Sequence, residues 1–455
     1  MNTLSKTVIG KKWQIYPALI ISSFCLLLPA FYNHYPLFVS DVGTYISSGF
    51  QLEMPIERPI TYGLLIRFFS LNGFSLWFVV IIQAYIVSWL IFKILKNVSN
   101  GRSYMLKSIF IVFVLSICTS LSWIVSEVQP DVFTSIAFLC IITILMGKED
   151  KKTNVLLYIL FFISVAVHLS HPTLMIITLL FLLIFSRLYI DKTGVRPRKK
   201  ILILIILSFG SMLTMAVQFS KSSHVFFIGS LLQKGVLKKY LDDNCAVKSY
   251  KICTYKEVLP TGADEFWWSP GSPLYKIGEW QGTRHEFNDI IHSVLTSPKY
   301  LKLYIIATVK QAGQQAVTFN IGDGNVPFPP GTKINDVVSE YFPRDVYWLN
   351  DTKQNKLHLW LVLATPNKVF SIVIISTLLA LGYVLVKWQR LSKEMRIVLF
   401  VCITGIFLNC LDCAAFGIVN GRFGCKMIWL IPFCVMVWLA SQQHSIRRQV
   451  TMSEM

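Results

Sequence analysis

Residues 105–147 read MLKSIFIVFVLSICTSLSWIVSEVQPDVFTSIAFLCIITILMG. Two apolar stretches, 105–126 and 131–147, are each long enough to cross the hydrocarbon core of a bilayer as a helix. The turn between them contains two carboxylates, Glu127 and Asp131. Charged groups beside membrane helices are costly to bury and often mark a site. The stretch therefore predicts a hairpin of membrane helices whose turn carries functional groups.

The same pattern extends along the whole chain. Of the 455 residues, 54% are apolar and only 15% are charged, whereas soluble domains carry about 25% charged residues. Apolar stretches of membrane-spanning length lie at 13–33, 74–95, 105–126, 131–147, 154–170, 172–190, 201–220, 366–387, 396–417 and 424–440. The sequence thus predicts an all-α polytopic membrane protein with about ten transmembrane helices.

The net charge of +19 indicates a membrane orientation and not a nucleic-acid partner. Six segments at alternate helix ends hold 22 of the 43 Lys and Arg residues but only five acidic residues; they are 1–12, 93–107, 148–152, 187–200, 387–396 and 441–455. Loops rich in Lys and Arg stay on the cytoplasmic side. We therefore expect a multi-pass membrane protein with both termini in the cytoplasm and no nucleic-acid partner. The richness in Lys, Ile, Asn and Phe suggests a bacterial genome, and hence a bacterial cytoplasmic membrane.

Three regions follow from this orientation. Residues 1–220 are expected to form a seven-helix membrane module, whose first outer loop covers 34–73. Residues 221–365 are too polar to insert and are expected outside the cytoplasm. Residues 366–455 hold three further transmembrane helices.

The segment 221–365 has two features of its own. Stretches 225–241 and 298–318 read as amphipathic helices, which commonly lie along a membrane surface. Cys245 and Cys253 are its only cysteines. A disulfide is expected in an extracytoplasmic segment, and two free thiols are the alternative. The other eight cysteines lie in or beside membrane helices and are interpreted as small apolar packing residues.

Ionisable and aromatic residues gather at the outer ends of the expected helices. They are Asp41, Arg58, Tyr62 and Arg67 near the first outer loop, Glu127 and Asp131 in the second turn, His168 and His171 in the third, and Asp412 and Arg422 near the last two helices. Polar groups at membrane depth are costly and usually functional. The gathering therefore predicts a catalytic or binding site at the outer face.

The loop carboxylates also have structural interpretations. Asp41 has the position of an N-cap for a helix beginning at Val42, and aspartate is a favoured cap. Glu127 and Asp131 could be solvated turn residues, with Asp131 stabilising the start of a helix. These interpretations remain open at the level of sequence.

The histidines and Asp412 have alternatives as well. His168 and His171 resemble a metal pair, but two ligands do not make a metal site, and a hydrogen-bonded helix end is the simpler interpretation. Asp412 lies in an apolar run, where an unpaired carboxylate is expensive. It needs Arg422, Arg67 or a bound cation as a partner. Signatures of common soluble enzymes, such as a Walker loop or HExxH, are absent.

With these residues in place, the chain resembles the GT-C superfamily of membrane glycosyltransferases. In that superfamily a module of seven helices comes first, its first outer loop holds an essential acid, and an outer segment and further helices follow. Asp41 lies where the family keeps its catalytic acid. The stretch 57–63, Glu-Arg-Pro-Ile-Thr-Tyr-Gly, is similar to the Arg-Pro entry to the second family helix. Glu127 and Asp131 occupy the turn where relatives often hold a second acid.

The resemblance implies transfer of a sugar from a polyprenyl-phosphate donor to a surface glycan or glycolipid acceptor, among membrane lipids. An acceptor hydroxyl needs a carboxylate to take its proton, and Asp41 is expected in that role. Glu127 or Asp131 would assist through the acceptor or a divalent cation. A leaving phosphate needs cations, and the bases near that plane are Arg58, Arg67, Arg422 and Lys426. The first loop lacks an Asp-x-Asp pair, which leaves metal dependence open.

Other functions fit the same residues. A secondary transporter or lipid flippase would use Asp412, Arg67 and the histidines along an ion or substrate path, although no internal repeat is visible. A glycan polymerase or ligase would also act at the outer face through external arginines. Tyr45, Tyr62, Trp267 and Trp268 could stack on sugar rings or anchor the chain at the membrane interface.

Overall fold

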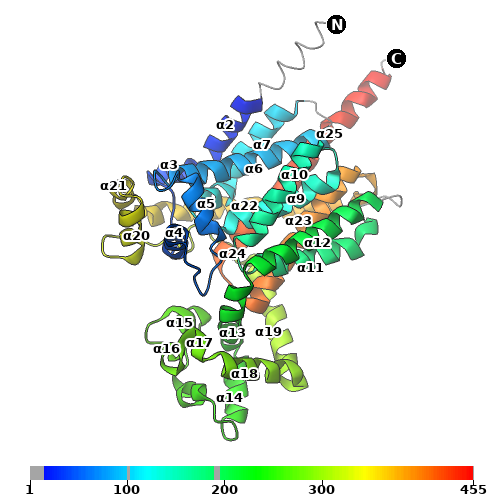
Figure 1. The fold of residues 1–455 in the computed structure, drawn as a ribbon. Coiled ribbons are helices and arrows are strands. Elements are labelled where there is room, and N and C mark those ends of the chain that lie inside the picture. Colours follow the sequence, from blue (N-terminus) through cyan, green and yellow to red (C-terminus); the bar gives the residue numbers. More distant parts are fainter. Residues whose placement is uncertain (1–14, 100–102, 189–194, 454–455) are drawn as a thin grey trace.

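The structure, a computed structural model, describes residues 15–99, 103–188 and 195–453, and most of them are helical (Figure 1). The first helices are α2 Ile15–Leu26, α3 Leu28–Asn33, α4 Val42–Gln51, α5 Thr61–Phe69, α6 Trp77–Val98, α7 Tyr104–Cys118, α8 Leu121–Ser126, α9 Asp131–Met146, α10 Lys151–Ala166, α11 His171–Ile184, the 3-10 helix η1 Ser186–Leu188 and α12 Val195–Thr214. The expected basic segment 1–12 lies outside the described residues.

The second half of the chain is also helical. Its helices are α13 Ala216–Gln233, α14 Val236–Asn244, η2 Lys251–Val258, α15 Ala263–Trp268, α16 Pro273–Ile277, α17 Glu279–Gly282, α18 Arg284–Thr296, α19 Pro298–Val317, α20 Lys333–Tyr341, α21 Val346–Asn350, α22 His358–Val386, η3 Trp388–Arg390, α23 Lys393–Phe416, α24 Gly421–Ile428 and α25 Leu430–Ser453. The described residues form no β-strand, and one isolated bridge joins Leu37 to Glu127.

Several helices are those of a membrane protein. Within the described ranges, α6, α22, α23 and the span Gly421–Gln442 are long and apolar enough to cross a membrane. Helices α12 and α13 pass the same test together but bend by 81° at their junction, so the number is five if this pair is one span. Helices α2, α7, α9 and α11 are apolar but shorter. The ten spans that the sequence predicts are therefore not confirmed.

Proline explains two differences from the expected spans. The first span is divided at Leu27 because Pro29 lies in the first turn of α3, and proline cannot continue a preceding helix. In contrast, Pro366 lies inside α22. The eighth expected span therefore begins at His358 and not at 366.

The amphipathic segments have different outcomes. The single helix expected over 225–241 is wrong, because the chain breaks at Gly235, whose φ of 69° lies in the left-handed region that glycine adopts freely. Helix α13 therefore ends at Gln233 and α14 begins at Val236. The helix expected over 298–318 is confirmed as α19, which packs along α23.

Helix α9 is the centre of the bundle. All of its residues are buried, and it packs against α6, α10, α23 and α24. Its sequence is apolar on all sides, as expected of a helix surrounded by others. The surrounding helices expose apolar side chains, including Leu213 of α12 and Leu379 of α22. Such large apolar surfaces are rare on soluble monomers.

The segment 221–365 does not form one unit. Residues 225–300 have a hydrophobic core of their own, joined by Ile418, and we name them the disulfide unit. They lie at the end of the bundle away from α2 (Figure 1). In contrast, buried residues between Ile321 and Leu349 belong to the core of the bundle.

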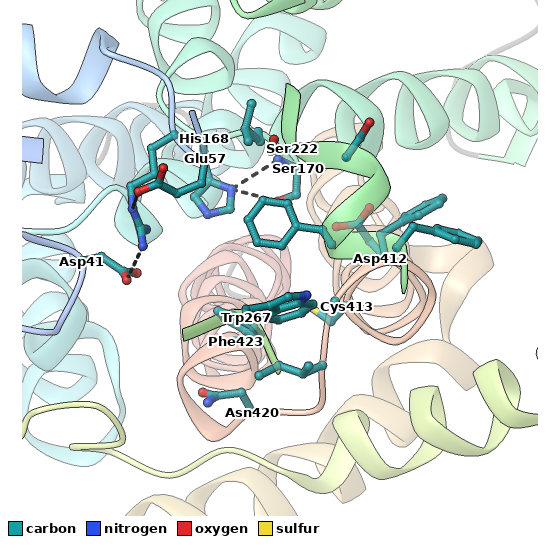
Figure 2. A pocket seen from close by; sticks show the side chains of 18 of the residues that line it. Asp41, Glu57, His168, Ser170, Ser222, Trp267, Asp412, Cys413, Asn420 and Phe423 are labelled. Carbon is teal, nitrogen blue, oxygen red and sulfur yellow. Dashed lines mark hydrogen bonds and ion pairs between the residues drawn. The ribbon is translucent and has the colours of Figure 1, made fainter. Parts of the chain in front are cut away.

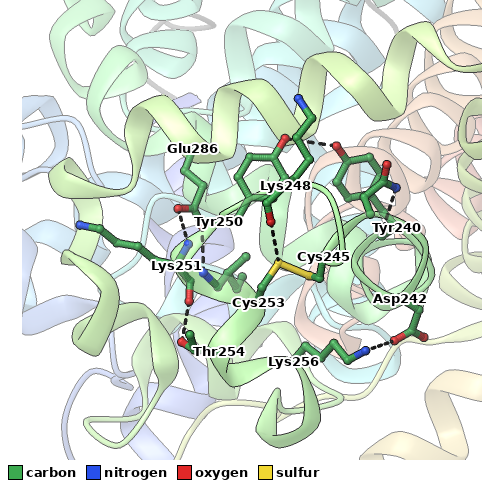
Figure 3. Close-up of a disulfide and its surroundings, with 12 residues drawn as sticks. Tyr240, Asp242, Cys245, Lys248, Tyr250, Lys251, Cys253, Thr254, Lys256 and Glu286 are labelled. Carbon is green, nitrogen blue, oxygen red and sulfur yellow. Dashed lines mark hydrogen bonds and ion pairs between the residues drawn. A yellow bond between two sulfur atoms is a disulfide. The ribbon is translucent and has the colours of Figure 1, made fainter.

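A disulfide joins Cys245 to Cys253 in this unit, with their Cα atoms 5.7 Å apart (Figure 3). This is the pairing expected from the sequence. Glu286 of α18 accepts hydrogen bonds from the backbone N–H groups of Lys251 and Ile252, at 2.8 and 3.0 Å. The cross-link and these bonds attach η2 to α14 and α18, and α18 carries residues toward the cavity described next.

Candidate functional site

A cavity of about 660 Å³ lies where the helix bundle meets the disulfide unit (Figure 2). Its ionisable lining residues include Asp41, Glu57, Arg58, His168, Asp264, Asp323, Asp412, Arg422 and Lys426. Its aromatic lining residues are Tyr45, Phe219, Phe226, Phe227, Trp267, Trp268, Phe416 and Phe423. A large apolar cavity with a few convergent polar groups is the best candidate for a binding site.

Asp41 lies in the loop before α4 and is held by three donors from elsewhere in the chain, besides the adjacent Ser40 hydroxyl at 3.5 Å. Its Oδ1 atom accepts a hydrogen bond from Arg58 Nη2 at 2.8 Å. Its Oδ2 atom accepts from Gln129 Nε2 at 3.0 Å and from Arg422 Nη2 at 3.2 Å. These donors come from three distant parts of the chain, so tertiary packing alone brings them to one carboxylate.

The role of Asp41 is therefore more than that of a helix cap. Asp41 has the N-cap position of α4, but its side chain makes no capping hydrogen bond. Burial by itself would raise the pKa of Asp41, but the charges of Arg58 and Arg422 outweigh burial and hold that pKa below its usual value. The carboxylate is consequently ionised.

Arg422, near the start of α24, joins Asp41 to Asp131. Its Nε atom lies 3.1 Å from Asp131 Oδ2, and the side chain of Asn420 caps the helix by accepting from the Arg422 N–H at 2.9 Å. The N–H of Gly421 donates to Asp323 Oδ2 at 2.9 Å. A Cβ atom at position 421 would lie only 2.8 Å from that oxygen. The tight turn thus positions one guanidinium between two carboxylates.

Arg58 connects the first loop to the disulfide unit. Its Cζ atom lies 5.5 Å from the ring centre of Tyr45 and 5.6 Å from that of Trp268. Guanidinium groups are attracted to aromatic faces at such distances. Arg58 is therefore held by Asp41 on the bundle side and by Trp268 on the other.

Glu127 and Asp131 are 4% and 2% exposed, so the interpretation as solvated turn residues is wrong. Neither lines the main cavity. Glu127 lies behind Arg422, beside a much smaller cavity of about 10 Å³ that Asp323 also lines. Burial raises the pKa of Glu127 to about 8, and its Oε2 atom has no hydrogen-bond partner among the described residues. Glu127 therefore carries a proton at neutral pH.

The two histidines have different environments. His171 is fully buried and is hydrogen-bonded to Thr134 Oγ1 at 2.8 Å and to the Ser164 carbonyl at 2.7 Å, which is a structural role. His168 lines the cavity. The backbone N–H of Ser170 donates to its Nδ1 atom at 3.3 Å, which assigns the proton of a neutral His168 to Nε2.

The structure does not bring Tyr62 and Arg67 into the cavity. Tyr62 is fully buried and donates to Gln83 Oε1 at 2.8 Å. Arg67, in the last turn of α5, donates to Asn72 Oδ1 at 2.8 Å. No three His, Cys, Asp or Glu side chains in the described ranges are arranged to hold a metal ion, so the histidine pair has no third ligand there.

Asp412 lies on α23, one turn before the helix ends at Phe416, and lines the cavity. It is 9% exposed, and its Oδ1 atom has no hydrogen-bond partner in the described part of the chain. Its expected partner Arg422 is occupied by Asp41 and Asp131. Lys426 also lines the cavity and is nearly buried, with Nζ 5.1 Å from the ring centre of Phe423.

Sequence reasoning missed Gln129 and Asp323 as parts of this site. Gln129 lies between the two acids of the turn 127–131, and Asp323 lies in the Gly322-Asp323-Gly324 turn. Polar residues beside proline or glycine indicate tight turns. Nothing in the local sequence indicates that the two turns lie close to Arg422.

Comparison with family models, curated proteins and solved structures finds no match to this chain. Its chemistry therefore follows from its own geometry. Two guanidinium groups and one ammonium group of the described residues line the cavity, together with five carboxylates and apolar walls. Guanidinium groups suit phosphate and carboxylate oxygens, which they bind in pairs. The guanidinium pair offers a binding point for an anionic group, and the apolar walls offer one for a hydrophobic chain.

Proposed function

We propose that the protein is a membrane glycosyltransferase of the GT-C type. It would move a sugar from a polyprenyl-phosphate donor to a glycan or glycolipid acceptor at the outer face of a bacterial cytoplasmic membrane. The observation that carries this proposal is the meeting of Arg58 and Arg422 on Asp41, at 2.8 and 3.2 Å, in a cavity with aromatic walls.

The donor phosphate would bind to the cationic groups. Arg58 and Arg422 each keep donor N–H groups beyond those that bind Asp41, because a guanidinium carries five. Negative charge builds on the phosphate oxygen as the glycosidic bond to the sugar breaks, and preorganised cations stabilise it most effectively in a site shielded from water. Lys426, on the next turn of α24, would add a third positive charge.

The walls of the cavity suit the rest of the donor. Phe219, Phe227 and Phe416 provide apolar surface for a prenyl chain. Trp268 lines the cavity and is 42% exposed, which leaves ring surface for a sugar. In this arrangement Asp41 holds the two guanidinium groups in place, and they are expected to rearrange around the phosphate when the donor binds.

The test uses purified protein in liposomes with labelled undecaprenyl-phosphate hexoses and pentoses and an extract of bacterial envelope glycolipids. We expect the wild type to transfer label and release undecaprenyl phosphate. Asp41→Asn and Arg422→Lys should reduce transfer by about 100-fold or more, because the first no longer holds the two guanidinium groups in position and the second lacks the paired donors of a guanidinium.

Asp351→Asn is the matched control, since Asp351 pairs with Lys356 on the surface and does not line the cavity. It should transfer at the wild-type rate. A folded Asp41→Asn variant with full transfer activity would count against the proposal.

A lipid flippase is the second candidate. The observation that favours it is Asp412, a nearly buried carboxylate without an ion-pair partner in the described residues of α23 and its neighbours, since such residues mark ion paths in membranes. Movement of labelled lipid between leaflets of the same liposomes, with no transfer of sugar, would support the flippase.

A further inference from the structure

Five carboxylates of the described chain line the cavity, and two of them, Asp41 and Asp412, have opposite surroundings. Figure 2 shows them on different sides of the cavity, with His168 and Trp267 between them in that view. Asp41 precedes α4, and Asp412 lies near the end of α23. A transfer reaction needs one group to hold the leaving phosphate and another to accept the proton of the attacking hydroxyl.

Asp41 is poorly suited to accept a proton. Both of its oxygens accept hydrogen bonds from guanidinium groups, and Oδ2 also accepts from Gln129. A proton could bind only where one of these bonds is lost. The same charges lower the pKa of Asp41, whereas a general base works best with a pKa near the working pH.

The Asp412 carboxylate lines the cavity, where it can receive a hydrogen bond from a ligand. Its Oδ1 atom has no partner in the described ranges, and no Lys, Arg or His side chain there forms an ion pair with it. Phe416, one turn further along α23, contacts Phe227 of α13 with ring centres 6.2 Å apart. A carboxylate left unpaired beside apolar rings is costly, and the hydroxyl of a bound acceptor would satisfy it.

Lys426 lines the same cavity but does not bind this carboxylate directly. The ammonium group is close enough to act on Asp412 electrostatically, but the two groups form no ion pair among those of the described residues. Asp412 thus remains a free acceptor with a positive charge nearby.

We infer that Asp412, and not Asp41, is the catalytic base of the proposed transfer, and this inference rests on the proposed function. The acceptor hydroxyl gives its proton to the Asp412 carboxylate as its oxygen bonds to the anomeric carbon. The bond from that carbon to the phosphate oxygen breaks, and the phosphate keeps the electron pair beside Arg58 and Arg422. The proton on Asp412 then passes to water or to the departing phosphate.

The experiment separates proton transfer from donor binding. Asp412→Asn, Asp412→Glu and Asp41→Asn are compared with wild type in liposomes, with the undecaprenyl-phosphate sugar that the wild type uses. The measurements are kcat and KM for that donor, the pH dependence of kcat, and the binding of undecaprenyl phosphate alone.

We expect Asp412→Asn to lower kcat by about 100-fold or more, the usual size of a general-base contribution, while leaving donor KM and undecaprenyl phosphate binding within about twofold. Asp412→Glu should recover part of the rate, because it restores a carboxylate. The fall in kcat at acidic pH should be absent from Asp412→Asn. Asp41→Asn should instead weaken undecaprenyl phosphate binding.

Cys410→Ser is the control for α23, because Cys410 lies on the same helix but does not line the cavity. It should match the wild type in all measurements. An Asp412→Asn variant that keeps kcat within about threefold of wild type, or that loses undecaprenyl phosphate binding as Asp41→Asn does, overturns the inference and leaves the proposed function standing. A wild type that binds undecaprenyl phosphate but transfers no sugar overturns both.

Discussion

At the scale of single residues, burial and pairing give carboxyl groups of one cluster different protonation states. Asp41 is held ionised by Arg58 and Arg422. Glu127, on the other side of Arg422, is held protonated by burial. A buried acidic group without enough positive charge around it takes up a proton and becomes neutral. The cluster therefore avoids an excess of negative charge around one guanidinium.

Glu127 makes stability depend on pH. Its pKa rises from an ordinary value of 4.5 to about 8 on folding, so the folded protein binds a proton that the unfolded chain releases. This contribution to stability is fully present below about pH 4.5 and is lost as the pH rises through 8. We expect the wild-type unfolding temperature in detergent to fall between pH 5 and pH 9, and Glu127→Gln to show a smaller fall.

The exposed residue Glu53 offers the control, and Glu53→Gln should follow the wild type across the whole pH range. Identical pH profiles for wild type and Glu127→Gln would show that residue 127 does not carry the extra proton.

At the scale of helices, the close contact of α4 and α5 determines the geometry of the first loop. Asp41 directly precedes α4, and Arg58 lies three residues before α5. The two helices touch at Gly49 and Gly63, where neither residue has a side chain. Glycine at a crossing permits the backbones to approach closely. The 2.8 Å ion pair between Asp41 and Arg58 therefore depends on this contact.

Gly63→Ala tests the contact. A Cβ atom at position 63 would overlap the Tyr45 carbonyl oxygen and the Gly49 nitrogen, and backbone atoms cannot move aside as a flexible side chain can. We expect a loss of about 1–3 kcal/mol in stability, typical of overpacking, and reduced transfer activity. Thermal unfolding and the liposome assay measure the two effects.

Gly382→Ala makes the same substitution on α22, where a Cβ atom would have no neighbour within 4 Å. It should leave stability unchanged or raise it slightly, since alanine favours helices. Equal behaviour of the two variants would contradict the importance of the α4–α5 contact.

At the scale of the whole molecule, the cavity lies between two bodies with separate hydrophobic cores. The helix bundle supplies Asp41, Arg422 and Asp412, while the disulfide unit supplies Trp267 and Trp268. If the basic helix ends are cytoplasmic, the disulfide unit lies on the opposite face of the membrane. Disulfides persist on that extracytoplasmic face, because the environment there is oxidising.

Cysteine labelling tests this orientation. Val258 of the disulfide unit and Lys152 at the start of α10 are both exposed. In intact cells, we expect a membrane-impermeant maleimide to label Val258→Cys, and to label Lys152→Cys only after the membrane is opened. The wild type provides the background from native cysteines. Labelling of both variants from the same side would exclude the proposed orientation.

Much of the fold is predictable because it depends on local composition. The apolar stretches became helices, and α6, α9 and α19 lie close to their expected bounds. The breaks were harder to predict. Pro29 ends one helix while Pro366 is tolerated inside another, because the surroundings of a proline decide whether its lost hydrogen bond can be accommodated. The number of complete crossings consequently did not follow from hydropathy.

The sequence by itself determined the helical class, the cysteine pair and the set of ionisable residues at the helix ends, because hydrophobic length, spacing and charge are local properties. Only the tertiary structure decided which of those residues meet. Asp41 and Arg422 are 381 positions apart, while Tyr62, Arg67 and His171 have partners outside the cavity. Charge pairing over such separations depends on how helices pack, and no periodicity in the chain encodes it.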